Sequence, residues 1–89
     1  MMNQIQVILT IDIDNLPTNY AELLKEEQAV VAAWKAEGVL THLYLRETKN
    51  GAILQFEGLT MEQVVKRIET LPFFQIKKDI QYLALIQQF

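Results

Sequence analysis

Alternating apolar and polar residues mark two stretches of the chain. From Ile5 to Asp14 the odd-numbered positions are apolar, and most of the even-numbered positions are polar. The alternation returns from Asp79 onward, where Ile80 and Tyr82 share one side. Successive side chains of a β-strand point to opposite faces of a sheet, so both stretches predict strands with one face on a core.

A hairpin is predicted in residues 38–58, around the pair Asn50-Gly51. This pair is the strongest short hairpin signal, because a type I′ turn requires positive φ at both central residues. A two-residue loop there pairs Leu45 with Phe56. One face of this hairpin is apolar and carries Leu43, Leu45, Leu54 and Phe56. The other face is polar and carries His42, Tyr44, Arg46, Gln55 and Glu57.

Apolar residues recur at helical spacing in two further segments. In the first, they run from Tyr20 to Trp34, and Gly38 follows as the residue that ends the helix. The second begins with a capping box at residues 60–63, in which a threonine hydroxyl and a glutamine side chain satisfy backbone N–H groups. Pro72 ends this second helix, because the residue before a proline avoids the helical conformation.

The predicted order is strand, helix, strand, strand, helix, strand. Two interleaved right-handed crossovers give a ferredoxin-like α+β fold, with a four-stranded antiparallel sheet and both helices on one face. Eighty-nine residues are enough for one domain, which we expect to span residues 1–89. The other face of the sheet carries Ile8, Leu83 and Leu85 among polar groups. Because such a face is too apolar to leave in water, we expect a homodimer or larger homo-oligomer formed by stacking these faces.

Composition narrows the classes of partner. The formal net charge is -3 and basic residues form no run, which argues against nucleic acid and anionic membranes as partners. Cysteine is absent and His42 is the only histidine, so no metal site is expected. No apolar run is long enough to span a bilayer, and the first residues do not resemble a signal peptide. We therefore expect a cytoplasmic protein.

Glu27 is the most specific chemical signal in the sequence. On a helical wheel it falls at the midpoint of the apolar stripe of the first helix, where a carboxylate is costly unless it is paired or neutral. Desolvation raises the pKa of a buried carboxyl, which suits a general acid or base at neutral pH. The alternative is a structural carboxyl that reaches solvent or accepts a hydrogen bond from a backbone group.

The polar face of the hairpin supplies the other candidates. Histidine is the side chain type that most often serves as a general acid or base, so His42 is a candidate catalytic residue beside Glu27, with a structural or interface role as the alternative. Tyr44, Arg46 and Gln55 are the candidate substrate-binding residues, and the first two can orient a carboxylate ligand.

The two candidate catalytic residues face different ways in the simplest arrangement. Alternation places His42 on the sheet face away from the helices, whereas Glu27 faces the sheet from the helix side. Within one protomer they meet only if a bulge near Leu40-Thr41 reverses the alternation. Otherwise they serve different surfaces.

Four short segments are familiar in combination: Leu23-Leu24-Lys25-Glu26-Glu27, Glu37-Gly38, His42-Leu43-Tyr44 and Leu71-Pro72-Phe73-Phe74. In order and spacing they resemble the muconolactone isomerase family. The resemblance implies a dimeric α/β barrel, in which ferredoxin-like protomers pair face to face and often assemble into larger rings. It also implies proton transfer on a five-membered lactone without cofactor or metal, with Glu27 and His42 at the acidic and histidine positions of the family.

The chain departs from the family in ways that leave three functions open. Thr41 and Leu45 stand where the family usually has arginines that would suit a carboxylate substrate, and the polar tail after the last strand is missing. The first function is a cofactor-free isomerase in which Glu27 moves a proton next to a carbonyl, and His42 or Arg46 polarises the oxygen. The second is a cofactor-free monooxygenase. The third is a non-catalytic module that binds a small organic molecule or serves assembly.

Overall fold

All six helices and strands predicted from the sequence are present, in the predicted order. The computed structural model describes residues 3–89. Its strands are β1 (Gln4–Ile11), β2 (Leu40–Leu45), β3 (Gly51–Glu57) and β4 (Lys77–Leu85). Its α-helices are α1 (Tyr20–Glu37) and α2 (Met61–Glu69), and the short 3₁₀ helices η1 (Ile13–Asn15) and η2 (Pro72–Ile76) lie in the connections.

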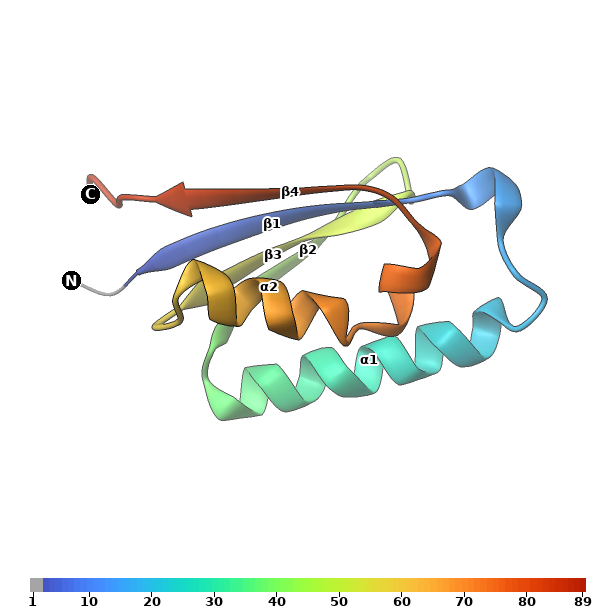
Figure 1. Ribbon diagram of the computed structural model, residues 1–89, viewed down its shortest axis with the longest axis horizontal. Coiled ribbons are helices and arrows are strands. Elements are labelled where there is room, and N and C mark those ends of the chain that lie inside the picture. Colours follow the sequence, from blue (N-terminus) through green and yellow to red (C-terminus); the bar gives the residue numbers. More distant parts are fainter. Residues whose placement is uncertain (1–2) are drawn as a thin grey trace.

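The four strands form one antiparallel sheet in the order β2-β3-β1-β4. Both helices lie on the same face of this sheet, as Figure 1 shows. This arrangement is the ferredoxin-like α+β fold, so the predicted fold class is confirmed. No helix among the described residues has the length and apolar character needed to cross a membrane.

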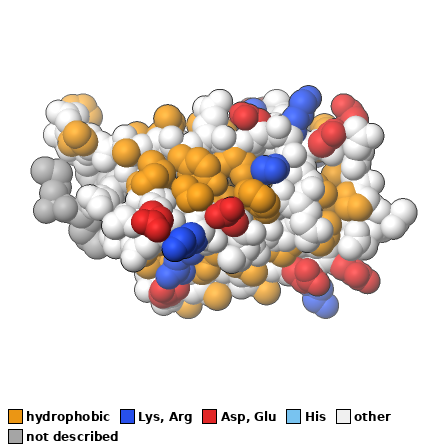
Figure 2. Space-filling view, in the orientation of Figure 1, with side chains coloured by type: hydrophobic (Ala, Val, Ile, Leu, Met, Phe, Trp, Pro, Cys, Tyr) orange, Lys and Arg blue, Asp and Glu red, His pale blue; other side chains and the backbone are white. Residues whose placement is uncertain are grey.

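The core lies between the sheet and the helices. Alternate residues of β1 are buried there, namely Ile5, Val7, Leu9 and Ile11. Val7 pairs with Leu54 and Ile5 with Phe56, so the buried residues of β3 lie beside them. The helices contribute the buried side chains Leu23, Trp34, Val64 and Ile68. Hydrophobic side chains also reach the surface between α2 and β4 (Figure 2).

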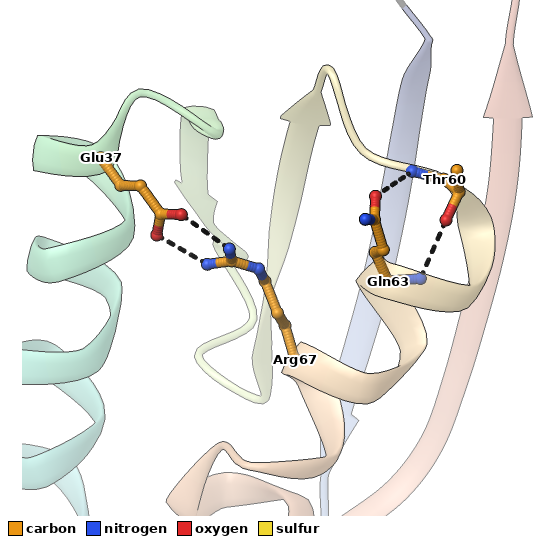
Figure 3. A network of polar contacts seen from close by, with 4 residues as sticks. All are labelled: Glu37, Thr60, Gln63 and Arg67. Carbon is orange, nitrogen blue, oxygen red and sulfur yellow. Dashed lines mark hydrogen bonds and ion pairs between the residues drawn. The ribbon is translucent and has the colours of Figure 1, made fainter.

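The predicted signals at the end of α1 and at the start of α2 are confirmed, whereas α2 ends at Glu69, three residues before the predicted stop at Pro72. Gly38 follows α1 in the left-handed conformation, with φ of 88°, and its N–H donates to the carbonyls of Trp34 and Lys35. At the start of α2 the Thr60 hydroxyl accepts from the Gln63 N–H at 3.2 Å, and Gln63 Oε1 accepts from the Thr60 N–H at 2.9 Å (Figure 3). These bonds satisfy backbone groups that the helices themselves cannot pair.

Arg67 ties the two helices together. Its two terminal nitrogens donate to the two carboxylate oxygens of Glu37 at 2.8 and 2.7 Å (Figure 3). The same guanidinium lies over the Trp34 ring, 5.9 Å from its centre. The Arg67 hydrogen bonds lower the pKa of the Glu37 carboxyl. Because a bidentate pair fixes the orientation of both groups, this contact holds the end of α1 against α2.

The predicted hairpin register is wrong. Leu45 pairs with Ala52 rather than with Phe56, and the loop between β2 and β3 spans residues 46–50 instead of two residues. The loop residue in the left-handed conformation is Lys49, with φ of 62°. The shift along β3, from Phe56 to Ala52, is an even number of residues. The apolar and polar faces of the hairpin are therefore the ones predicted.

Pairing with β1 explains the register. Gly51 already lies opposite Thr10, and the Asn50 carbonyl accepts from the Ile11 N–H at 2.8 Å. The φ of Gly51 is 153°, and a side chain there would clash with the carbonyl oxygen of Leu9. The glycine therefore serves the close approach of β3 to β1, and the turn forms earlier in the chain.

The first strand also ends sooner than its alternation predicts, at Ile11 instead of Asp14. The Asp12 carboxylate accepts a hydrogen bond from the Asp14 N–H at 3.2 Å. This local bond begins η1 and takes the backbone out of the sheet.

Candidate functional site

Glu27 lies in the middle of α1, next to η2. Only 8% of its surface is exposed, so the burial that the apolar stripe predicts is confirmed. Its Oε1 accepts a hydrogen bond from the backbone N–H of Phe73 at 3.0 Å. The structural alternative for Glu27 was a carboxyl that accepts a hydrogen bond from a backbone group. This hydrogen bond is also present.

Two opposing effects act on the Glu27 carboxyl. Burial raises its pKa above the usual 4.5, and the Phe73 N–H, which favours the ionised form, lowers it by a smaller amount. Glu27 forms no ion pair within residues 3–89. In the same part of the chain, no buried side-chain oxygen or nitrogen lacks a hydrogen-bond partner. Oε1 makes the one hydrogen bond of Glu27 there, and Oε2 is not completely buried.

Glu27 borders a cavity of about 230 Å³ between α1 and the hairpin. The wall is mostly apolar and includes Ile11, Leu24, Leu43, Leu45 and Leu54. Tyr20 and Phe73 add a stacked aromatic pair, with ring centres 5.6 Å apart and planes 14° apart. The polar side chains at this cavity are Glu27, Gln28, Arg46 and Lys49.

Arg46 and Lys49, the two basic residues at the cavity, come from the β2–β3 loop. Arg46 Nη1 donates to Thr10 Oγ1 at 2.6 Å, which anchors the side chain against β1. Neither cation forms an ion pair within residues 3–89. Sequence reasoning missed Lys49, because the predicted two-residue turn placed it inside the strand pair. The longer loop places it at the cavity instead.

His42 lies on the sheet face away from the helices, where simple alternation placed it. A bulge does occur between Leu40 and His42: Leu40 pairs with Phe56, and His42 pairs with Gln55. Its effect is to turn Leu40 toward the core, while His42 stays on the far face. The bulge therefore does not bring His42 and Glu27 together.

Tyr44 and Gln55 lie on the same far face as His42. The His42 and Tyr44 rings stack with their centres 6.0 Å apart and their planes at 4°, and Tyr44 is 54% exposed. Of the five candidate residues, Glu27 and Arg46 line the cavity. The other three share the far face of the sheet, and they are His42, Tyr44 and Gln55.

A second hollow of about 500 Å³ lies between α1 and β2, and His42 borders it with Lys35 and Thr41. The two hollows adjoin, because Gln28 and Leu43 line both. His42 reaches this region because β2 is an edge strand of the sheet. Within residues 3–89, no three His, Cys, Asp or Glu side chains are grouped as ligands of a metal ion would be.

Two solved structures share this fold. A crystal structure of muconolactone isomerase matches with a TM-score of 0.76 and 19% sequence identity, covering 99% of this chain and 91% of that one. The 5-chloro-2-hydroxyhydroquinone dehydrochlorinase of Burkholderia phenoliruptrix AC1100, in complex with 2,5-dihydroxybenzoquinone, matches with a TM-score of 0.65 and 12% identity, covering 93% of each chain. No protein-family model matches the chain, and no curated protein sequence does. The resemblance to muconolactone isomerase is thus confirmed at the level of the fold.

Proposed function

We propose that this protein transfers a proton on a small lactone or enol without a cofactor, with Glu27 as the group that carries the proton. One observation carries the proposal: a buried carboxyl lines an apolar cavity, and only one of its two oxygens is hydrogen-bonded within the described chain. A desolvated carboxylate is a stronger base than one in water, because burial raises its pKa. That property suits removal of a weakly acidic proton next to a carbonyl.

In the proposed reaction, Glu27 Oε2 takes a proton from the carbon next to the substrate carbonyl. The electron pair of the broken C–H bond forms an enolate, and its negative oxygen needs a positive partner. Arg46 is the better placed of the two candidates for this role, since it lines the cavity and His42 does not. The protonated Glu27 then returns the proton to another carbon of the same conjugated system, which completes an isomerisation.

The structural relatives support the size and type of ligand. One acts on a lactone by its name, and the other was solved with a dihydroxybenzoquinone. Both compounds are small, cyclic and rich in oxygen. A cavity of about 230 Å³ with the Tyr20–Phe73 pair in its wall suits a ligand of this kind.

We also propose that the protein is a homodimer formed by stacking the far faces of two sheets. Leu83 on this face is 41% exposed, and the partly exposed Ile8 and Ile53 lie near it. In such a dimer His42 and Tyr44 would lie at the interface. His42 then has a structural role, which was the alternative to catalysis.

A second function is favoured by the Phe73 hydrogen bond. That bond gives Glu27 a structural task, because it satisfies a backbone donor at the start of η2. With Thr41 and Leu45 in place of the family's arginines, the chain would then bind a small molecule without converting it.

A ligand screen followed by a turnover assay separates these functions. Small lactones, enols and aromatic acids are screened by thermal shift. A ligand present at ten times its Kd is expected to raise Tm by roughly 5–10 °C. Each ligand found is then followed by NMR for isomerisation. In an enzyme, Glu27→Gln lowers turnover by about 10²–10⁴-fold, because an amide cannot carry the proton.

The neighbouring Glu26→Gln is the matched control, since Glu26 is exposed and does not line the cavity. It should leave both binding and turnover unchanged. A ligand that binds but is never converted would favour the binding module. Failure of every compound to bind would count against both functions.

A further inference from the structure

At the start of η2, the backbone N–H of Phe73 has no hydrogen-bond acceptor within the turn. Leu71 is extended, with ψ of 136°, and Pro72 begins η2 without an N–H group. The Phe74 N–H donates back to the Leu71 carbonyl at 2.9 Å. Phe73, between them, donates outside the turn, to Glu27 Oε1 at 3.0 Å.

Aromatic contacts hold this donor in place. The Phe73 ring stacks on Tyr20 of α1 at 5.6 Å, and Lys77 Nζ lies over the Phe74 ring, 4.4 Å from its centre. These contacts tie both phenylalanines of the turn to their neighbours, which restrains the direction of the Phe73 N–H. The donor is aimed at Oε1, so Oε2 is the oxygen of this cavity-lining residue that has no hydrogen bond among the described residues.

We propose that η2 is a positioning element for the proton carrier: the Phe73 N–H holds Glu27 Oε1, so that Oε2 alone gives and takes the proton at the cavity. The proposal rests on the proposed function and assigns a role to a backbone group that no side-chain motif would reveal. In the neutral carboxylic acid, the N–H points at Oε1, so the proton belongs on Oε2. In the carboxylate, the same N–H stabilises the negative charge and opposes the effect of burial.

Replacing one backbone amide by an ester tests this role directly. The chain of 89 residues is short enough for chemical synthesis with phenyllactic acid in place of Phe73, which removes the N–H and keeps the ring. The same replacement at Phe74 is the matched control. It removes the hydrogen bond to the Leu71 carbonyl in the same turn but leaves the bond to Glu27 intact.

Two measurements are made on each protein, and neither needs a substrate. The first is an NMR titration of Glu27 labelled with ¹³C at Cδ, which reports its pKa. The second is the pH dependence of esterification of Glu27 by a small diazoacetamide, which reacts with the protonated carboxyl. Because the hydrogen bond lowers the pKa, the Phe73 ester should raise it and move the esterification profile to higher pH. The Phe74 ester should move neither.

Three results would overturn the proposal. One is an unchanged Glu27 pKa in the Phe73 ester, and another is an equal shift in both esters. The third is a Phe73 ester that unfolds where the Phe74 ester folds, since the bond would then be a scaffold contact. The outcome is independent of the ligand screen: a protein that converts no compound can still show the shift, and an active protein can fail to show it.

Discussion

Glu27 combines two requirements that usually belong to different residues. Its Oε1 satisfies a backbone donor in a turn, and its carboxyl belongs to the wall of a cavity, where we propose that Oε2 carries the proton. A buried carboxylate without an ion pair is costly, so a residue that only capped the turn would be better as a neutral side chain. The hydrogen bond to the Phe73 N–H therefore does not explain why residue 27 is a charged side chain.

Replacing Glu27 by neutral side chains separates the cap from the charge. Glu27→Gln keeps an oxygen for the Phe73 N–H and removes a charge that is costly to bury. We expect its free energy of unfolding at neutral pH to lie within about 1 kcal/mol of the wild type, or above it. Glu27→Met leaves the Phe73 N–H unpaired and should cost ~1–3 kcal/mol. Urea denaturation measures both, and a loss of several kcal/mol in Glu27→Gln would make Glu27 a scaffold residue.

The pH dependence of the same proteins has a defined sign. Because the pKa of Glu27 is raised above 4.5, the folded protein binds a proton more readily than the unfolded chain. The contribution of Glu27 to stability is therefore largest below pH 4.5, and it falls as the pH rises through the raised pKa. We expect the stability difference between wild type and Glu27→Gln to decline across this window and to be constant above it. A difference that does not change with pH would contradict the raised pKa.

Single residues were predictable where a periodic pattern defined their surroundings. The helical wheel located Glu27, because burial of a helix face depends on spacing alone. The partner of Glu27 was not predictable in this way: the Phe73 N–H becomes available because of the local geometry of a 3₁₀ turn. Lys49 was missed because its position depends on the length of the β2–β3 loop. That length follows from the pairing of Gly51 with β1.

At the scale of elements, local signals decided the helices and a distant partner decided the hairpin. The ends of α1 and α2 follow from Gly38 and from the capping box, both of which act within a few residues. The hairpin register depends instead on β1, which pairs with Gly51 across the sheet. The Asn50-Gly51 pair favours a two-residue turn locally, but the pairing of Gly51 with β1 overrides this preference.

The capping box of α2 gives a prediction at this scale. Thr60→Ala removes the hydroxyl that accepts from the Gln63 N–H, and should lower the free energy of unfolding by about 1 kcal/mol. In a chain of this size such a loss corresponds to a decrease in Tm of roughly 4–8 °C. Thr60→Ser keeps the hydroxyl and serves as the control. Equal destabilisation of the two variants, measured by thermal unfolding, would show that the hydroxyl is not what stabilises this end.

At the scale of the whole molecule, the far face of the sheet exposes apolar side chains that no other part of the described chain covers. Ile53 lies near the middle of this face, paired with Ile8 on one side and Tyr44 on the other. Leu83 adds a further exposed apolar side chain. The alternation of β1 and β4 predicted these positions correctly, because face assignment needs only a period of two.

A charge placed on this face tests the proposed homodimer. The wild type should have twice the mass of one chain, or a larger even multiple, in light scattering at micromolar concentration. Ile53→Lys buries an unpaired charge in the stacked interface and should yield monomers. Ala29→Lys, on the exposed side of α1, is the control and should leave the mass unchanged. A wild type that is monomeric at this concentration would refute the face-stacked dimer.

The position of β1 in the sheet also determines when this protein can fold during its synthesis. β1 is hydrogen-bonded to β3 on one side and to β4 on the other. The ribosome makes β1 first among the strands and β4 last. One edge of an apolar strand therefore remains unpaired until residues 77–85 have emerged, and open strand edges are templates for aggregation. The sheet is therefore complete only after β4 has left the ribosome, and until then the free edge of β1 is a place where nascent chains can pair with one another.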